Sequence, residues 1–235
     1  MDNRTEQLAD GVWRVEVITY VNTFVLANDG RGDDAGLTVV DTGTASGGPR
    51  LVRSVRMLGL DPRAIRDVLL THWHGDHAGS AARFASSSAG TRVWASQADL
   101  GVVRGGAPPP KPSDATRLGQ LGARLLARPA APVPGAQALA ADEVRDVAGG
   151  LRVVAAPGHT PGHLAFLLPA RGVLLAGDAL FNVGRLAQPR FIYQSLADQR
   201  ATLADIAGLD YDVLAVGHGP AVTDHARARV ARLVG

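Results

Sequence analysis

The first part of the chain alternates apolar and polar residues at the period of a β-strand. Residues 12–17 follow this alternation, and the apolar runs at 21–26 and 37–40 have the length of strands. The connection at 28–34 is rich in Asn, Asp and Gly, which are turn-forming residues. Three strands in series with no helix between them predict an antiparallel beginning to a sheet.

Helical and strand periods alternate in the next segment. Apolar residues recur at helical spacing over 51–58, which predicts an amphipathic helix. Apolar runs at 65–70 and 91–94 predict strands, and residues 78–84 are typical of the beginning of a second helix. Ser96 is a residue type that favours the N-cap of a third helix.

The second half of the chain returns to short apolar runs separated by turns. Four of these runs predict strands, at residues 144–147, 151–154, 164–168 and 173–176. A helix over 196–206, a strand at 213–216 and a closing helix from Asp224 complete the pattern. This order predicts an α/β fold in which two mixed β-sheets pack together between outer helices, an αββα sandwich.

One Pro-rich segment interrupts the pattern at about 105–135. Runs of Pro, Gly and Ala occupy 105–114 and 128–135, and the apolar residues between them predict a helix over 118–126. Because chemically active residues lie on both sides, we expect an insertion packed over the site and a single domain over 1–235. The insertion is also a candidate contact surface for a homodimer.

Composition and charge narrow the classes of function. The 235 residues are 20% charged, with a net charge of only +2. The basic residues are scattered, so we expect a small-molecule substrate and no nucleic-acid partner. The N-terminus is polar and no apolar run approaches the roughly 20 residues that span a bilayer, so we expect no membrane segment and a cytoplasmic protein. The absence of cysteine excludes thiolate ligands and a cysteine nucleophile.

Four potential metal ligands lie within six residues on a predicted strand-to-helix loop. They are His72, His74, Asp76 and His77. Three of the seven histidines of the chain lie in this segment, which makes chance clustering a poor explanation. In an extended chain His72 and His74 point the same way, and a turn at Gly75 re-aims the next two ligands toward a neighbouring position.

Three further candidates lie beside Gly or Pro, where loops form: His159, Asp178 and His218. Imidazole and carboxylate ligands without thiolate suit Zn, Mn or Fe. Asp41, at the end of the third predicted strand, is placed to accept a hydrogen bond from a ligand histidine and fix its tautomer. His163 is expected to support the site without binding metal.

These residues, in this order and spacing, resemble the metallo-β-lactamase superfamily. The resemblance rests on His72-x-His74-x-Asp76-His77, on segments 39–43 and 157–163, and on Gly177-Asp178 and Gly217-His218-Gly219. It covers nearly the whole chain and looks most like the glyoxalase II-like branch of metallo-hydrolases. The resemblance implies the αββα fold, with a metal site at one edge of the sandwich.

The resemblance also implies two divalent metal ions, with Zn expected first and Mn or Fe as alternatives. The ligands implied for one ion are His72, His74 and His159. Those implied for the other are Asp76, His77 and His218, with Asp178 as a bridge. A hydroxide held between two such ions attacks an electrophilic centre, and Asp76 is the candidate catalytic residue because it can relay a proton.

The implied activity is hydrolysis of a small ester-like substrate, such as a thioester or a lactone. N-acyl homoserine lactonases share the ligand set but carry Tyr three residues after the bridging Asp, where this chain has Phe181. An alternative is a mononuclear iron persulfide dioxygenase, which resembles the same motifs. A metal-free binding protein is a third interpretation, and the complete ligand set argues against it.

Substrate choice is expected to lie with the insertion at 105–135 and with the loop 181–193, since both overhang the site in this fold. In that loop, Arg185 and Arg190 are candidates to hold an anionic group, and Tyr193 is a candidate to reach the site. The sequence therefore predicts where the substrate lies but not what it is.

Overall fold

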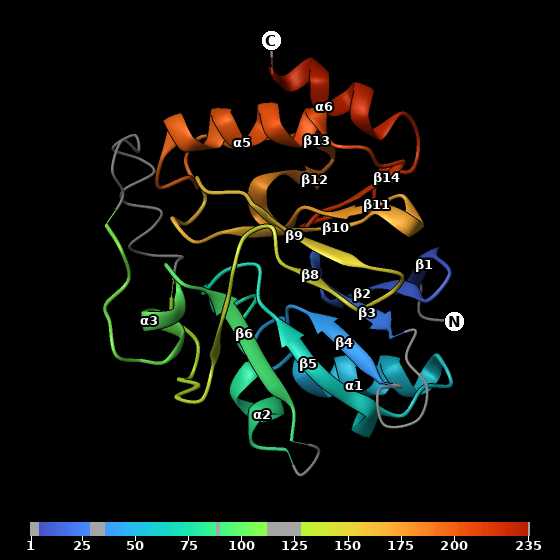
Figure 1. The fold of residues 1–235 in the computed structure, drawn as a ribbon, viewed down its shortest axis with the longest axis vertical. Helices are drawn as coiled ribbons and strands as arrows, with labels where there is room; N and C mark the ends of the chain where they lie inside the picture. Colours follow the sequence, from blue (N-terminus) through green and yellow to red (C-terminus); the bar gives the residue numbers. More distant parts are fainter. Residues whose placement is uncertain (1–4, 29–35, 88–89, 112–127, 235) are drawn as a thin grey trace.

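Two mixed β-sheets pack face to face between outer helices, which confirms the predicted αββα sandwich (Figure 1). The computed structural model describes residues 5–28, 36–87, 90–111 and 128–234. The helix predicted over 118–126 lies outside the described residues. A third sheet is a hairpin of two short strands, β12 (Phe181–Val183) and β13 (Arg185–Ala187).

The first sheet has seven strands in chain order, β1 to β7. The first four are antiparallel neighbours and the last four are parallel neighbours, so β4 joins the two halves. The predicted antiparallel beginning is therefore confirmed. The strands are β1 (Thr5–Ala9), β2 (Val12–Ile18), β3 (Val21–Ala27), β4 (Leu37–Val40), β5 (Ile65–Leu69), β6 (Arg92–Ser96) and β7 (Gln137–Leu139).

The second sheet has five strands in the order β14-β11-β10-β9-β8. Its neighbours are antiparallel except β11 and β14, which run parallel. Gly172, with φ of 62°, supplies the left-handed turn that leads into β11. The strands are β8 (Val144–Arg145), β9 (Leu151–Ala155), β10 (Leu164–Leu168), β11 (Val173–Leu175) and β14 (Val213–Ala215).

Helices cover the outer faces of both sheets, with α1 and α2 on the first and α5 and α6 on the second (Figure 1). Among the described residues, no helix has the length and apolar character needed to cross a membrane. The helices are α1 (Gly48–Met57), α2 (Ala81–Ala85), α3 (Leu100–Val103), α5 (Leu196–Gly208) and α6 (Ala226–Val234), with 3-10 turns at Pro62–Ala64, Pro169–Arg171 and Gly177–Ala179.

The central strands contribute apolar side chains to layers on both of their faces. In β4, Val39 packs in the cluster beneath α1, whereas Val40 lies between the two sheets. In β10, Phe166 lies between the sheets and Leu167 packs in the cluster beneath α5 and α6. Successive strand residues point to opposite faces, so a strand that is covered on both sides is a continuous apolar run.

Several predicted boundaries were wrong. Ser96 is the last residue of β6 and α3 begins only at Leu100, so Ser96 is not the N-cap; its hydroxyl accepts the Asp99 N–H at 3.2 Å instead. The strand predicted over 144–147 is limited to Val144–Arg145. Strands β1, β7, β12 and β13 were not predicted, because they are short and lie where the apolar alternation is weak.

A buried carboxylate in β5 links the two large sheets. Asp67 in β5 accepts hydrogen bonds from the Arg92 guanidinium and from the Trp94 indole at 2.6 Å. Arg145 in β8, from the other sheet, lies 3.9 Å from Asp67 and places its guanidinium carbon 4.1 Å from the Trp94 ring centroid. The contact therefore holds β8 against β5 and β6.

Replacing Asp67 with Ala should lower the free energy of unfolding by about 1–3 kcal/mol, because the partly buried indole N–H of Trp94 loses its acceptor. Urea unfolding of the metal-loaded protein measures this change. Asp10→Ala, which removes an exposed carboxylate 3.9 Å from Arg171, is the matched control and should change stability by less than about 0.5 kcal/mol. Equal effects of the two changes would contradict the role of Asp67.

Candidate metal centre

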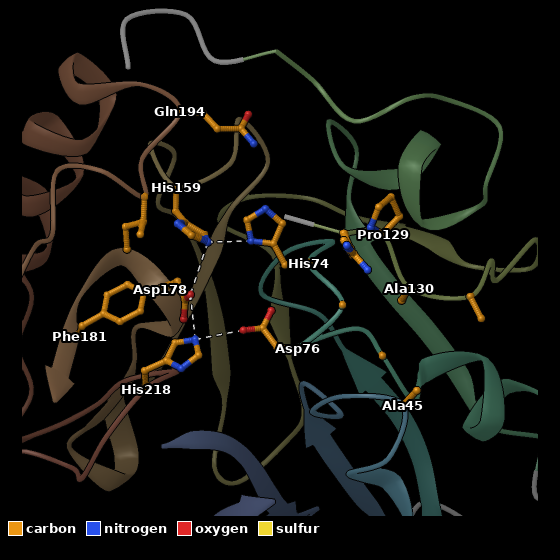
Figure 2. A pocket seen from close by; sticks show the side chains of 15 residues that line it. Ala45, His74, Asp76, Pro129, Ala130, His159, Asp178, Phe181, Gln194 and His218 are labelled. Carbon is orange, nitrogen blue, oxygen red and sulfur yellow. Dashed lines mark hydrogen bonds and ion pairs between the residues drawn. The ribbon is translucent and has the colours of Figure 1, made fainter. Parts of the chain in front are cut away.

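The seven candidate ligands lie on loops that follow four strands of the two large sheets (Figures 1 and 2). The segment 72–77 follows β5, His159 follows β9, Asp178 follows β11 and His218 follows β14. Because β11 and β14 are parallel neighbours, the loops at their carboxyl ends lie side by side. The topology therefore brings together residues that are far apart in the chain.

The first ligand group consists of His72, His74 and His159, each with a ring nitrogen within 4.8 Å of the others. All three side chains are buried. Nδ1 of His74 lies 2.9 Å from Nε2 of His159. The chain bends at Thr71 and Trp73 and turns over 75–77, as expected at Gly75, and it directs His72 and His74 toward one point.

The second ligand group consists of Asp76, His77 and His218. Nε2 of His77 lies 3.3 Å from Nε2 of His218, and a carboxylate oxygen of Asp76 lies 3.4 Å from the same atom of His218. Asp178 lies between the two groups, with one carboxylate oxygen 3.4 Å from His159 and 3.2 Å from His218 (Figure 2). The structure thus brings all seven predicted residues together.

One buried carboxylate orients a histidine in each ligand group. Oδ2 of Asp41 accepts hydrogen bonds from Nδ1 of His77 at 2.8 Å and from the Thr71 hydroxyl at 2.7 Å. Because the Thr71 hydrogen points to Asp41, the Thr71 oxygen accepts from Nδ1 of His72 at 2.9 Å. Both histidines therefore use Nδ1 in these hydrogen bonds and turn Nε2 toward the centre, and the predicted hydrogen bond between Asp41 and a candidate ligand histidine is present.

Other side chains fix the loops of the second sheet. Nε2 of His163 accepts the backbone N–H of Asp178 at 2.9 Å, in line with its predicted supporting role. Asp99 accepts hydrogen bonds from the Thr160 hydroxyl at 2.9 Å and the Gly162 N–H at 3.1 Å, and burial raises its pKa to about 6. These bonds tie the loop after β9 to the first sheet.

The side-chain amide of Asn22, a buried residue of β3, holds the loop after β14. Its NH2 group donates to the carbonyl oxygens of Val216 at 2.8 Å and Gly219 at 2.6 Å. Arg14 donates to its oxygen at 3.0 Å. The amide therefore spans the turn that carries His218, a role that nothing in the sequence of the predicted strand indicated.

The two ligand groups differ in charge in the metal-free chain. Burial lowers the pKa of all three histidines of the first group, that of His74 to about 4. Burial acts in the same direction on the second group, but the neighbouring carboxylates, with Asp178 foremost, together outweigh it and raise the pKa of both histidines, that of His218 to about 9. Near pH 7 the first group is neutral, and the second consists of paired charges.

The donor set fits a divalent cation. Nε2 of His72 is buried and, within the described part of the chain, has no hydrogen-bond partner. Its tautomer places a lone pair there, and a buried acceptor without a partner is costly. The same lone pair faces the close ring nitrogens of His74 and His159. A cation bound by these three nitrogens satisfies all of them, as imidazole ligation of Zn does.

A pocket of about 610 Å³ opens over the ligand groups (Figure 2). Its wall includes Arg128, Pro129, Ala130 and Ala131, which belong to the described end of the predicted insertion. Ile192, from the predicted substrate loop 181–193, also lines the pocket, whereas the sequence did not single out Ala45, Gly79 and Gln194. They carry no chemical signature, and only the folded chain shows that they border the site.

Three candidate residues of the loop 181–193 do not line the pocket. Arg185 and Arg190 are exposed and lie outside its lining. Tyr193 is buried, and its hydroxyl donates to the Ala179 carbonyl at 3.1 Å. Phe181 does line the pocket, and its ring stacks on the imidazole of His218 with centroids 4.9 Å apart.

The arrangement of the ligands agrees with a match to a known family. The sequence profile of the metallo-β-lactamase superfamily matches residues 18–218. The chain belongs to this superfamily. Members of the superfamily bind metal ions, and the histidine and aspartate groups described above form its candidate metal site.

Curated relatives within the superfamily include a hydrolase and a thioesterase. Hydroxyacylglutathione hydrolase GloC of Haemophilus influenzae is 28% identical over 203 residues, which cover 81% of this chain and 84% of that protein. Thioesterase pkgB of Emericella nidulans is 30% identical over 186 residues, 78% of this chain but only 43% of that protein. Uncharacterized protein YobT of Bacillus subtilis is 26% identical, with 78% of each chain covered.

Solved structures share the fold. The metallo-beta-lactamase family protein TTHA1429 from Thermus thermophilus is 28% identical, with a TM-score of 0.67, and the match covers 96% of this chain and 78% of that one. Rm3 metallo-beta-lactamase has a TM-score of 0.73 at 20% identity, over 98% of this chain and 91% of that one. At this identity the second match concerns the fold alone.

The charge difference predicts that the two ligand groups bind zinc with different pH dependences. Cations must displace protons from the second group at pH 7, whereas the first group is already neutral. Lowering the pH from 8 to 6 should weaken binding at the second group about tenfold per unit for each displaced proton, and weaken the first group less. Chelator competition at pH 6, 7 and 8 measures both constants, and equal slopes would contradict the assignment.

Asp41→Asn should weaken metal binding about 10- to 100-fold, because the new NH2 group faces a histidine N–H instead of accepting from it. Asp142→Asn is the matched control, since Asp142 has φ of 62° against 58° for Asp41 but lies on the surface. Metal affinity by competition and folding by circular dichroism distinguish the outcomes. An unchanged affinity in Asp41→Asn would show that the carboxylate does not orient the ligands.

Proposed function

We propose that this protein is a metal-dependent hydrolase that cleaves a small ester-like substrate, with a thioester as the first choice and a lactone as the second. The position of Asp178 between two three-residue ligand groups, beneath an open pocket, carries the proposal. Two relatives, a hydroxyacylglutathione hydrolase and a thioesterase, support thioester chemistry. Zinc is the proposed metal, with Mn or Fe as alternatives.

The proposed site holds two cations. His72, His74 and His159 would hold one, Asp76, His77 and His218 the other, and Asp178 would contact both. When bound, the cations supply positive charge that polarises the substrate carbonyl and lowers the pKa of water. This chemistry requires no protein nucleophile, in keeping with a chain that has no cysteine.

The chain's own residues orient the ligands and move a proton. Asp41 and Thr71 hold the ring nitrogens of His72 and His77 in the direction of the centre. The Asp76 carboxylate lines the pocket and its side chain is 39% exposed, so it is placed to carry a proton to the leaving group. Asp76 is therefore the proposed catalytic residue.

An iron dioxygenase for persulfides is the second candidate, and the charges of the site favour it in one respect. The second ligand group is already compensated by Asp76 and Asp178 without a cation, because the pKa of His77 and of His218 is raised. In the neutral first group, Nε2 of His72 is a buried atom without a hydrogen-bond partner among the described residues. One iron on the first group and Asp178 would satisfy the site.

We also propose the domain organisation, partners and compartment of the protein. The chain acts as a single domain over 1–235, with the insertion at 105–135 as part of it. Its substrate is a small molecule, and it has no nucleic-acid or membrane partner. The compartment is cytoplasmic, and any homodimer would use the insertion.

Elemental analysis of protein purified without added metal tests the two candidates. Two zinc or manganese ions per chain are expected and lead to a panel of thioesters, lactones and phosphoesters. One iron per chain would favour the dioxygenase, which oxygen uptake with glutathione persulfide then checks. A chain that holds no metal and takes none up on reconstitution would end the proposal that it is an enzyme.

His74→Ala should abolish turnover and lower metal content while the fold remains, because it removes one nitrogen of the first group without opening the apolar layers. Circular dichroism reports the fold and elemental analysis the metal. His225→Ala is the control, since that side chain is 80% exposed and lies outside the ligand groups. Full activity of His74→Ala would contradict the metal assignment.

A further inference from the structure

The pocket wall beyond the ligand groups is mainly apolar. Pro129 and Ala130 lie on one side of the ligands and Phe181 on the other (Figure 2). Ala131 and Ile192 extend these two sides. A substrate group that reaches the ligands therefore passes between two apolar surfaces, which come from segments about fifty residues apart in the chain.

The wall on the insertion side is fixed to the metal-binding loop. The Gly75 N–H donates to the Arg128 carbonyl at 2.8 Å, and Pro129 pairs with His74 as an isolated antiparallel bridge. A few residues further on, the Val133 N–H donates to the Val103 carbonyl at 2.9 Å. The residues between these hydrogen bonds are therefore held in position relative to the first ligand group, and they form a fixed wall of the pocket.

The lining offers little to a strongly polar substrate. Apart from the candidate ligands, the described lining residues include two polar side chains, Arg128 and Gln194. The glutathione part of a thioester carries two carboxylates and an ammonium group, and one guanidinium matches only one of these charges. Desolvating unmatched charges is unfavourable, whereas an alkyl group gains free energy from the same surface.

We infer that the substrate carries an apolar acyl group, which lies between the Pro129–Ala131 wall and the Phe181–Ile192 side while its carbonyl carbon faces the ligand groups. The pocket of about 610 Å³ has the size of small-molecule sites. This inference rests on the proposed function and names the acyl part of its substrate. In the reaction the acyl–sulfur bond breaks, the carbonyl carbon gains the hydroxyl of water, and the thiolate gains a proton.

A series of thioesters tests the inference. S-acyl N-acetylcysteamines from acetyl to octanoyl share one leaving group, and kcat/KM is measured with metal-loaded protein. We expect kcat/KM to rise about three- to fourfold per methylene until the pocket is filled, which is the effect of burying one CH2 group. S-lactoylglutathione should be a poorer substrate than the hexanoyl thioester.

A matched pair of variants locates the effect. Ile192→Asp places a charge in the pocket lining and should flatten the dependence on chain length. Val183→Asp places the same charge on a side chain that is 47% exposed and outside the lining, and should keep the parent profile. Metal content and circular dichroism confirm that both variants are loaded and folded.

The outcomes separate the inference from the proposed function. A rising profile that Ile192→Asp flattens supports both. Turnover without dependence on chain length, or a preference for S-lactoylglutathione, overturns the apolar acyl group but leaves the hydrolase. Absence of turnover on every thioester by metal-loaded protein overturns the thioester hydrolase, and the inference falls with it.

Discussion

The metal site depends on the position of one buried carboxylate. Asp41 has a left-handed backbone conformation at the end of β4 and accepts hydrogen bonds from the N–H and hydroxyl of Thr71 and from His77. A carboxylate can only accept, so each donor around it has one orientation, and through Thr71 this extends to His72. Asp41 therefore orients one histidine in each of the two ligand groups.

Two pairs of parallel strands bring the candidate ligands together. The β4–β5 pair places Asp41 beside the loop that contains His72 and His77, and the β11–β14 pair places Asp178 beside His218. The apolar layer between the two sheets determines how the ligands from the first sheet lie relative to those from the second.

The sequence predicted the fold and the ligand set because both have local signatures: apolar runs mark covered strands, and histidines at fixed spacing mark the ligands. It did not predict Asn22 as the residue that holds the turn of His218, because an asparagine in a strand has no pattern of its own. Arg185 was a candidate for substrate binding on charge alone and lies outside the pocket. Which loop residue borders a pocket is decided by long-range packing.

The bonds that attach the insertion to the sandwich join backbone atoms, from Gly75 to Arg128 and from Val133 to Val103. Backbone bonds persist whatever side chains are attached, apart from proline at a donor position. The residues between these bonds are therefore free to vary by mutation while the histidines beside them keep their places. Substitutions in this part of the pocket wall can therefore change which substrates fit, while the ligand residues keep their positions. A single substitution is enough to alter the shape of the pocket.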